Sequence, residues 1–105
     1  MRLTPEEKNA ICSVVRSFCP AQALLYLYGS RADDTKSGGD IDLLLVVSSS
    51  NVEELVGNKI HHILATLKQA IGDQHIDFSV QTPEKAAKNP FFKMILKSAV
   101  ELGRW

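Results

Sequence analysis

Apolar residues along the chain show two patterns: some recur every three to four residues, as in a helix, and others form short continuous runs. The first helical stretch begins at a capping box, Thr4 to Glu7, and ends before Pro20. Its inward stripe consists of Ala10, Ile11, Val14, Val15 and Phe18. Residues 23–28 and 40–47 are short apolar runs next to glycines, which predicts two buried strands.

The second half of the chain repeats this alternation of helix and strand. Residues 52–71 predict a long helix that Gly72 stops, and residues 75–80 alternate as a third strand. Thr82 and Asn89 each precede a proline: the first predicts a short helix and the second predicts the last helix, which ends at Gly103. The inward residues expected of that last helix are Phe91, Ile95, Leu96, Ala99 and Leu102. The αβαβαβα order predicts an α/β (α+β) fold, with a small mixed three-stranded sheet and flanking helices.

Length, charge and hydropathy narrow the class of protein. The 105 residues suit one domain, residues 1–105, and twelve basic residues balance twelve acidic ones. A neutral chain is not built to coat nucleic acid by charge, and no apolar run is long enough to cross a bilayer. The start of the chain resembles a helix rather than a signal peptide, and Cys12 and Cys19 lack the spacing of a zinc site. We therefore expect a cytoplasmic protein with reduced cysteines.

Three aspartates are placed to hold metal ions. Residues two apart on a strand point to the same face, so Asp40 and Asp42 project together at the start of the second strand. Two adjacent carboxylates repel each other unless a cation lies between them, and hard oxygen ligands favour Mg²⁺ or Mn²⁺. Asp77 lies near the start of the third strand. The intervening helix allows a parallel crossover, which would bring Asp77 to the same edge of the sheet.

A phosphate-binding turn is expected beside these acids. Gly29-Ser30 follows the first strand, where glycine allows close backbone approach and N–H groups with the Ser30 hydroxyl can bind phosphate oxygens. For this turn to meet Asp40, the first two strands must run antiparallel. Arg31 and Lys36 are further candidates for binding the nucleotide. Three carboxylates, two metal ions and a phosphate cradle are what in-line nucleotidyl transfer requires.

At these residues the sequence resembles a known family. Gly29-Ser30-Arg31-Ala32 with Asp40-Ile41-Asp42-Leu43 is similar to the signature of the DNA polymerase beta-like nucleotidyltransferase superfamily, in its minimal, MNT-type branch. The resemblance covers almost the whole chain and implies the polymerase beta-like nucleotidyltransferase fold. It implies that Asp40 and Asp42 bind both metals, that Asp77 binds one and helps deprotonate the acceptor hydroxyl, and that Gly29 and Ser30 hold the triphosphate. The implied activity is transfer of NMP, with AMP from ATP expected, to a protein or small-molecule acceptor.

The resemblance also implies a partner. MNT proteins often pair with a helical HEPN protein as the antitoxin of a toxin–antitoxin system, sometimes by adenylylating it. A chain of this size has no second domain to position an acceptor, so we expect a HEPN-like partner, a homodimer, or both. The contact surface is predicted on the C-terminal helix, at Phe92, Met94 and Val100, together with Trp105.

Several alternatives remain open at the level of sequence. Arg31 either binds phosphate or pairs with Asp33 or Asp34, acids that stand where family members often continue with Arg-Gly. His75 should face the same side as Asp77, and Tyr26 and Tyr28 are expected to be packing residues. Besides an enzyme, the chain could be a weak or inactive nucleotidyltransferase-fold module that neutralises a partner by contact, or an inert dimerisation domain.

Overall fold

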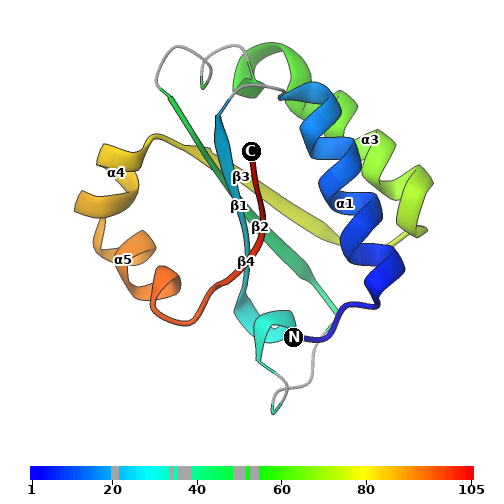
Figure 1. Ribbon diagram of the computed structural model, residues 1–105, viewed down its shortest axis with the longest axis horizontal. Coiled ribbons are helices and arrows are strands. Elements are labelled where there is room, and N and C mark those ends of the chain that lie inside the picture. The colour runs from blue at the N-terminus through cyan, green and yellow to red at the C-terminus, as the bar shows by residue number, and fades with distance from the viewer. Residues whose placement is uncertain (20–21, 34, 36–38, 49–51, 53–54) are drawn as a thin grey trace.

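The computed structural model describes residues 1–19, 22–33, 35, 39–48, 52 and 55–105. A mixed sheet lies at the centre, with helices against both faces (Figure 1). In chain order the elements are α1 (Pro5–Phe18), β1 (Ala23–Tyr28), the 3-10 turn η1 (Gly29–Ala32), β2 (Ile41–Val47), the π-helical turn η2 (Leu55–Lys59), α3 (Ile60–Ile71), β3 (Ile76–Gln81), α4 (Pro83–Lys88), α5 (Pro90–Leu96) and β4 (Val100–Arg104).

The sheet has the strand order β3-β2-β1-β4. β1 runs antiparallel to β2 and β4, whereas β2 and β3 run parallel, as the crossover through α3 requires. The predicted pairings of the first three strands are therefore confirmed. The register places Asp42 between Tyr28 of β1 and Asp77 of β3. The acidic positions and the end of β1 thus meet at one edge of the sheet.

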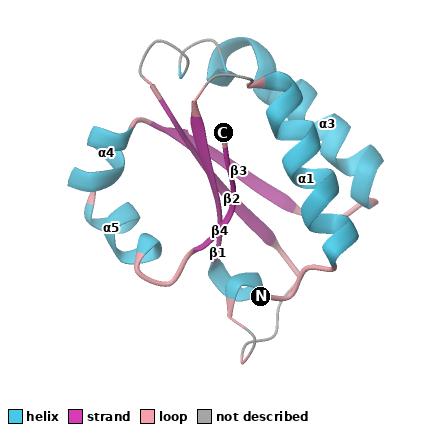
Figure 2. Cartoon of the chain, in the orientation of Figure 1, coloured by secondary structure: helices cyan, strands magenta, loops and turns pink. Residues whose placement is uncertain are grey.

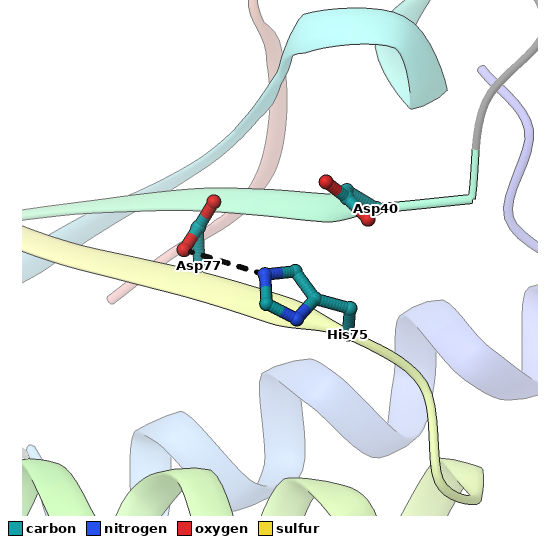
Figure 3. Close-up of side chains that lie close together, drawn as sticks. All are labelled: Asp40, His75 and Asp77. Atoms are coloured by element: carbon teal, nitrogen blue, oxygen red, sulfur yellow. Dashed lines mark ion pairs between the residues drawn. The ribbon is translucent and has the colours of Figure 1, made fainter.

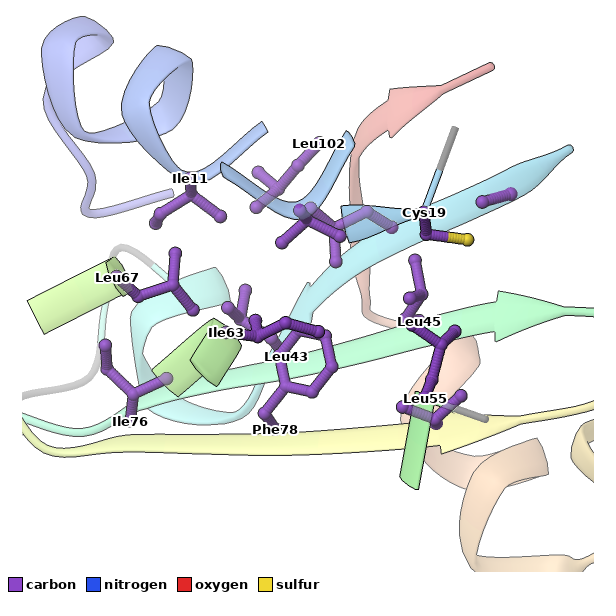
Figure 4. Packing of buried hydrophobic residues seen from close by; sticks show 14 of the residues in the cluster. Ile11, Cys19, Leu43, Leu45, Leu55, Ile63, Leu67, Ile76, Phe78 and Leu102 are labelled. Carbon is purple, nitrogen blue, oxygen red and sulfur yellow. The ribbon is translucent and has the colours of Figure 1, made fainter. Parts of the chain in front are cut away.

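The two faces of the sheet carry separate hydrophobic clusters. Helices α1 and α3 cover one face (Figure 2), and alternate strand residues from Leu25 to Val80 pack there with Ile11 and Ile63. Figure 4 shows part of this packing around Leu43 and Phe78. Helices α4 and α5 lie on the opposite face, where the buried residues are Leu44, Val46, Ala86 and Phe92. None of the described helices is long and apolar enough to cross a membrane.

The C-terminal segment differs from the prediction. The predictions of a three-stranded sheet and of a last helix that ends at Gly103 are wrong. Helix α5 ends at Leu96, and residues Val100–Arg104 form a fourth strand. In this strand Leu102 is buried, and β4 pairs with β1 along what would otherwise be an open sheet edge. The Trp105 N–H donates to the Ala23 carbonyl at 3.0 Å and the Trp105 ring N–H to the Cys19 carbonyl at 2.6 Å. Pairing and burial at long range therefore override the local helical pattern.

The shorter α5 also changes which of two neighbouring phenylalanines is buried. Its helical stripe runs through Phe92, Ile95 and Leu96, so Phe92 is buried and Phe91 is 51% exposed. The prediction that Phe91 faces inward and Phe92 outward is wrong. The helix expected over residues 52–71 is likewise divided, since the π-helical turn at Leu55–Lys59 contains Gly57, a poor helix former, and α3 begins at Ile60.

Candidate functional site

Two strands deliver polar side chains to the same place. The parallel register pairs Ile41 with Ile76 and Asp42 with Asp77, and the Ile41 N–H donates to the His75 carbonyl at 3.0 Å. One residue before these pairs stand Asp40 and His75. Both isoleucines are buried against the α1 and α3 face, so the residues on either side of each point to the opposite face. Asp40 and Asp42 therefore lie beside His75 and Asp77 as one cluster of four polar side chains.

The cluster is compact enough to hold a metal ion. One ligand atom each from Asp40, His75 and Asp77 lie within 4.8 Å of one another, and all three side chains are exposed. His75 Nε2 lies 3.8 Å from Asp77 Oδ1. Figure 3 shows Asp40 and Asp77 pointing away from α1 and α3. Carboxylate oxygens with an imidazole nitrogen are a donor set that divalent metals accept, so the residues fit a metal.

Asp42 is the electrostatically strained member of the cluster. Partial burial raises the pKa of the Asp42 carboxyl, and the nearby charge of Asp77, a hydrogen bond with Asp77 and the charge of Asp40 raise it further. His75 acts in the opposite direction. Such repulsion among carboxylates is relieved when a cation binds between them. The free protein therefore carries an unfavourable concentration of negative charge at the position where a divalent cation would be attracted.

Gly29 brings the end of β1 close to these acids. Its φ is +75°, and a Cβ at this position would overlap Oδ2 of Asp42. Glycine is required here for both the left-handed backbone and the close approach. The turn η1 follows directly, so the backbone of Gly29 and Ser30 lies beside the Asp42 carboxylate. The structure thus brings the predicted phosphate turn together with the predicted metal ligands.

A cavity of about 700 Å³ opens beside the turn. Tyr28, Gly29 and Ser30 line it from the sheet side, and Phe91 and Met94 line it from α5. This volume lies in the range of roughly 300–1,000 Å³ usual for small-molecule sites. The cavity therefore has the backbone of the turn at one side and apolar side chains of α5 at the other.

Tyr28 belongs to the site, although its sequence pattern predicts only packing. Burial raises the pKa of its hydroxyl, and the charges of Asp42 and Asp77 raise it further, while a hydrogen bond with Ser79 lowers it. Because it pairs with Asp42 across the sheet, Tyr28 shares the face of the acids. The signal available in the sequence was its position directly before Gly29, at the end of a strand.

The other candidate residues have different surroundings. Arg31 donates to the carbonyl oxygens of Arg2 at 2.9 Å and Gly39 at 3.3 Å, and to Oε1 of Gln74 at 3.0 Å. Its guanidinium therefore joins η1 to the segments before β2 and before His75. Whether Arg31 also binds phosphate stays a prediction. Lys36 and Asp34 lie outside the described residues.

The predicted partner surface is only partly exposed. Phe92 is buried, Val100 belongs to β4, and Trp105 packs against Gly103 near Cys12. These three residues cannot form the helical contact that was predicted, because the C-terminal helix ends earlier. Of the predicted set, Met94 is 62% exposed on α5, next to the exposed Phe91.

Comparison with known proteins identifies the family of the chain. A search of curated proteins found no significant match. A family model described as a nucleotidyltransferase domain matches residues 10–104, which include the glycine–serine turn, the acids and all four strands. The match confirms the resemblance to polymerase beta-like minimal nucleotidyltransferases, and the chain therefore belongs to the nucleotidyltransferase domain family.

Proposed function

We propose that this protein transfers a nucleoside monophosphate from an NTP to an acceptor hydroxyl, forming a bond from the hydroxyl oxygen to the α-phosphate and releasing pyrophosphate. The observation that carries the proposal is the convergence of Asp40, Asp42 and Asp77 beside the Gly29 turn. Family membership supports nucleotidyl transfer in general. The shared face of the acids and the turn adds a specific place where a triphosphate and divalent cations would meet.

Each residue has a role that follows from its position. Asp40, Asp42 and Asp77 would hold the metal ions, which supply charge neutralisation and lower the pKa of a bound hydroxyl. Gly29 allows the backbone to approach the carboxylates, and the Ser30 hydroxyl and N–H groups of η1 bind phosphate oxygens. Asp77 accepts the proton of the acceptor hydroxyl, because its side chain is 61% exposed and it pairs with Asp42 across the two strands. We infer two Mg²⁺ or Mn²⁺ ions, with ATP as donor and AMP as the group transferred.

The acceptor is held by another protein in this proposal. Positioning supplies much of the rate of group transfer, and the sheet edge beside the acids is open. Phe91 and Met94 flank the same cavity as Ser30, and apolar and Met side chains are favoured at protein interfaces. We infer that a helical HEPN-like partner contacts this part of α5 and presents its hydroxyl to the site, as in a toxin–antitoxin pair.

Labelled ATP tests the proposal directly. The purified protein is incubated with α-phosphate-labelled ATP, Mg²⁺ or Mn²⁺, and the product of the neighbouring gene. We expect label on the partner protein, and none when Asp42→Asn replaces the wild-type chain. Labelling that persists with a folded Asp42→Asn variant would exclude the proposed site.

A second function is favoured by one observation. Asp33 lines the same cavity as Gly29 and Ser30, and its negative charge opposes an incoming triphosphate. The alternative is a module that neutralises its partner by contact with little or no transfer. In that case the complex forms equally well with wild type and Asp42→Asn, and neither labels the partner.

A further inference from the structure

The first residues of β2 and β3, with the residue before each strand, form two matching triplets that differ at one position. Asp40-Ile41-Asp42 lies in register with His75-Ile76-Asp77, so an imidazole stands where perfect symmetry would place a carboxylate. We propose that His75 is a direct metal ligand that makes this site prefer Mn²⁺, Co²⁺ or Zn²⁺ to Mg²⁺. This inference rests on the proposed function, because it concerns the metal of the same site.

The geometry supports ligation rather than a simple ion pair. His75 Nε2 is 3.8 Å from Asp77 Oδ1, beyond the usual range of a hydrogen bond, and their side chains are 67% and 61% exposed. An exposed pair at this separation contributes little by itself. One ring nitrogen of His75 and one oxygen each of Asp40 and Asp77 lie within 4.8 Å of one another, which suits three ligands around one ion. Figure 3 shows a ring nitrogen of His75 turned toward the Asp77 carboxylate, with Asp40 on the neighbouring strand.

The donor chemistry sets the direction of the preference. Mg²⁺ favours oxygen ligands and keeps several waters, so replacing one oxygen ligand with an imidazole gives it no advantage. Imidazole suits later divalent metals, and affinity at sites of this kind rises from Mn²⁺ through Co²⁺. An imidazole also adds no negative charge to a cluster that already contains three carboxylates. His75 therefore supplies a ligand without adding to the repulsion among the acids.

Metal titrations of three variants test the inference. Mn²⁺ and Co²⁺ binding is followed by EPR and by the visible Co²⁺ spectrum, with Mg²⁺ measured by competition. For His75→Ala we expect Mn²⁺ and Co²⁺ affinity to fall at least about tenfold, and Mg²⁺ affinity to change less. For His75→Asp, which restores the symmetrical carboxylate, we expect the preference to move toward Mg²⁺. The control is His62→Ala, an exposed histidine on α3, which should change nothing.

An NMR experiment tests whether the metal ion binds beside His75, while the change in metal preference of His75→Ala and His75→Asp tests direct ligation. Substoichiometric Mn²⁺ should broaden the imidazole signals of His75 while those of His61 and His62 on α3 stay sharp. An unbroadened His75, or equal losses of Mn²⁺ and Mg²⁺ affinity in His75→Ala, would overturn the inference. Either result leaves the proposed function standing if Asp42→Asn still abolishes transfer. By contrast, full transfer by Asp42→Asn would remove the proposed function whatever metal His75 contacts.

Discussion

The two faces of β2 show how one strand serves two purposes. On the face toward α1 and α3, Ile41, Leu43 and Leu45 are completely buried. On the other face Leu44 and Val46 pack under α4 and α5, but Asp42 at the start of the strand is only partly covered. The first face is closed along its whole length, whereas the second is closed at one end and open at the other.

This difference separates the residues that stabilise the fold from those that form the site. A closed apolar face contributes free energy through burial, at about 25 cal/mol per Å² of apolar area removed from water. The open end instead concentrates carboxylates whose mutual repulsion opposes folding. Substitutions on neighbouring residues of one strand should therefore have opposite consequences, and the following predictions test this contrast from the largest expected effect to the smallest.

Replacing an acid on the open face should abolish activity without unfolding the protein. Asp42→Asn removes a metal ligand, and loss of several kcal/mol of transition-state stabilisation corresponds to about a 10³-fold slower transfer. Transfer is measured with labelled ATP, and folding by circular dichroism. The control is Glu84→Gln, which neutralises an exposed carboxylate on α4, outside the acidic cluster. Equal activity of the two folded variants would show that Asp42 plays no part in the reaction.

Truncating a residue on the closed face should have the opposite profile. Leu43 is completely buried next to Asp42, so Leu43→Ala leaves a cavity and should lower the free energy of unfolding by about 2–5 kcal/mol. Urea denaturation measures this loss. Phe91→Ala, at a side chain 51% exposed on α5, should stay within about 0.5 kcal/mol of wild type. Similar losses in both variants would contradict the distinction between the faces.

The junction between β1 and the site can be tested with two glycines. Gly29 and Gly72 both have positive φ, but only at Gly29 would a Cβ meet Asp42. We expect each alanine variant to lose about 1–2 kcal/mol from backbone strain. Only Gly29→Ala should also displace the Asp42 carboxylate and weaken Mn²⁺ binding, which EPR would detect. If Gly72→Ala weakened Mn²⁺ binding equally, the close approach at Gly29 would have no special role.

The smallest expected effect is on stability without metal. Partial burial and the neighbouring carboxylates raise the pKa of Asp42 above its ordinary value, so the folded protein holds this proton more tightly than the unfolded chain does. The free energy of unfolding of the metal-free protein should therefore fall as the pH rises from the pKa of Asp42 in the unfolded chain through its raised pKa in the folded protein. Asp42→Asn should lack this loss. At neutral pH we expect the variant to have a Tm higher by roughly 2–5 °C.

Calorimetry at several pH values measures this difference in Tm. The difference should disappear at acid pH, where Asp42 of the wild type is protonated and therefore as uncharged as the asparagine. Saturating Mn²⁺ should reverse the order, because only the wild-type site is complete and binding stabilises the folded state. A variant less stable than metal-free wild type at neutral pH would indicate that Asp42 supports the fold.

The sequence allowed much of the fold to be predicted because its strongest signals are local. Apolar runs and glycine stops placed β1 within its observed bounds, and the capping box at Thr4 is present with both hydrogen bonds. β4 was missed because its stability comes from pairing with β1, more than seventy residues earlier, rather than from local pattern. Phe91 and Phe92 were exchanged for the same reason, since the length of α5 depends on where β4 begins.

The site was predictable to the extent that it depends on alternation along strands. Side-chain direction on β2 and β3 follows from a period of two, which aligned Asp42 with Asp77 once the strands were parallel. The contribution of Tyr28 depends on the register between β1 and β2, which residue spacing alone does not determine. Arg31 donates hydrogen bonds to segments that come together only on folding, so its contacts with Arg2 and Gln74 could not be predicted.

The isoleucines at the centre of the two matched triplets have a consequence for evolution. Ile41 and Ile76 are paired in the sheet and buried on its far side, so they anchor the alignment of the polar residues on either side of them. A slip of one residue in either strand would turn the isoleucine of that strand toward water and its polar residues toward the core. Selection therefore acts against mutations that loosen this pair for two reasons, because they destabilise the fold and because they displace the residues of the site. Sequence drift in a descendant that has abandoned catalysis should become visible first at the aspartates, while the isoleucines persist.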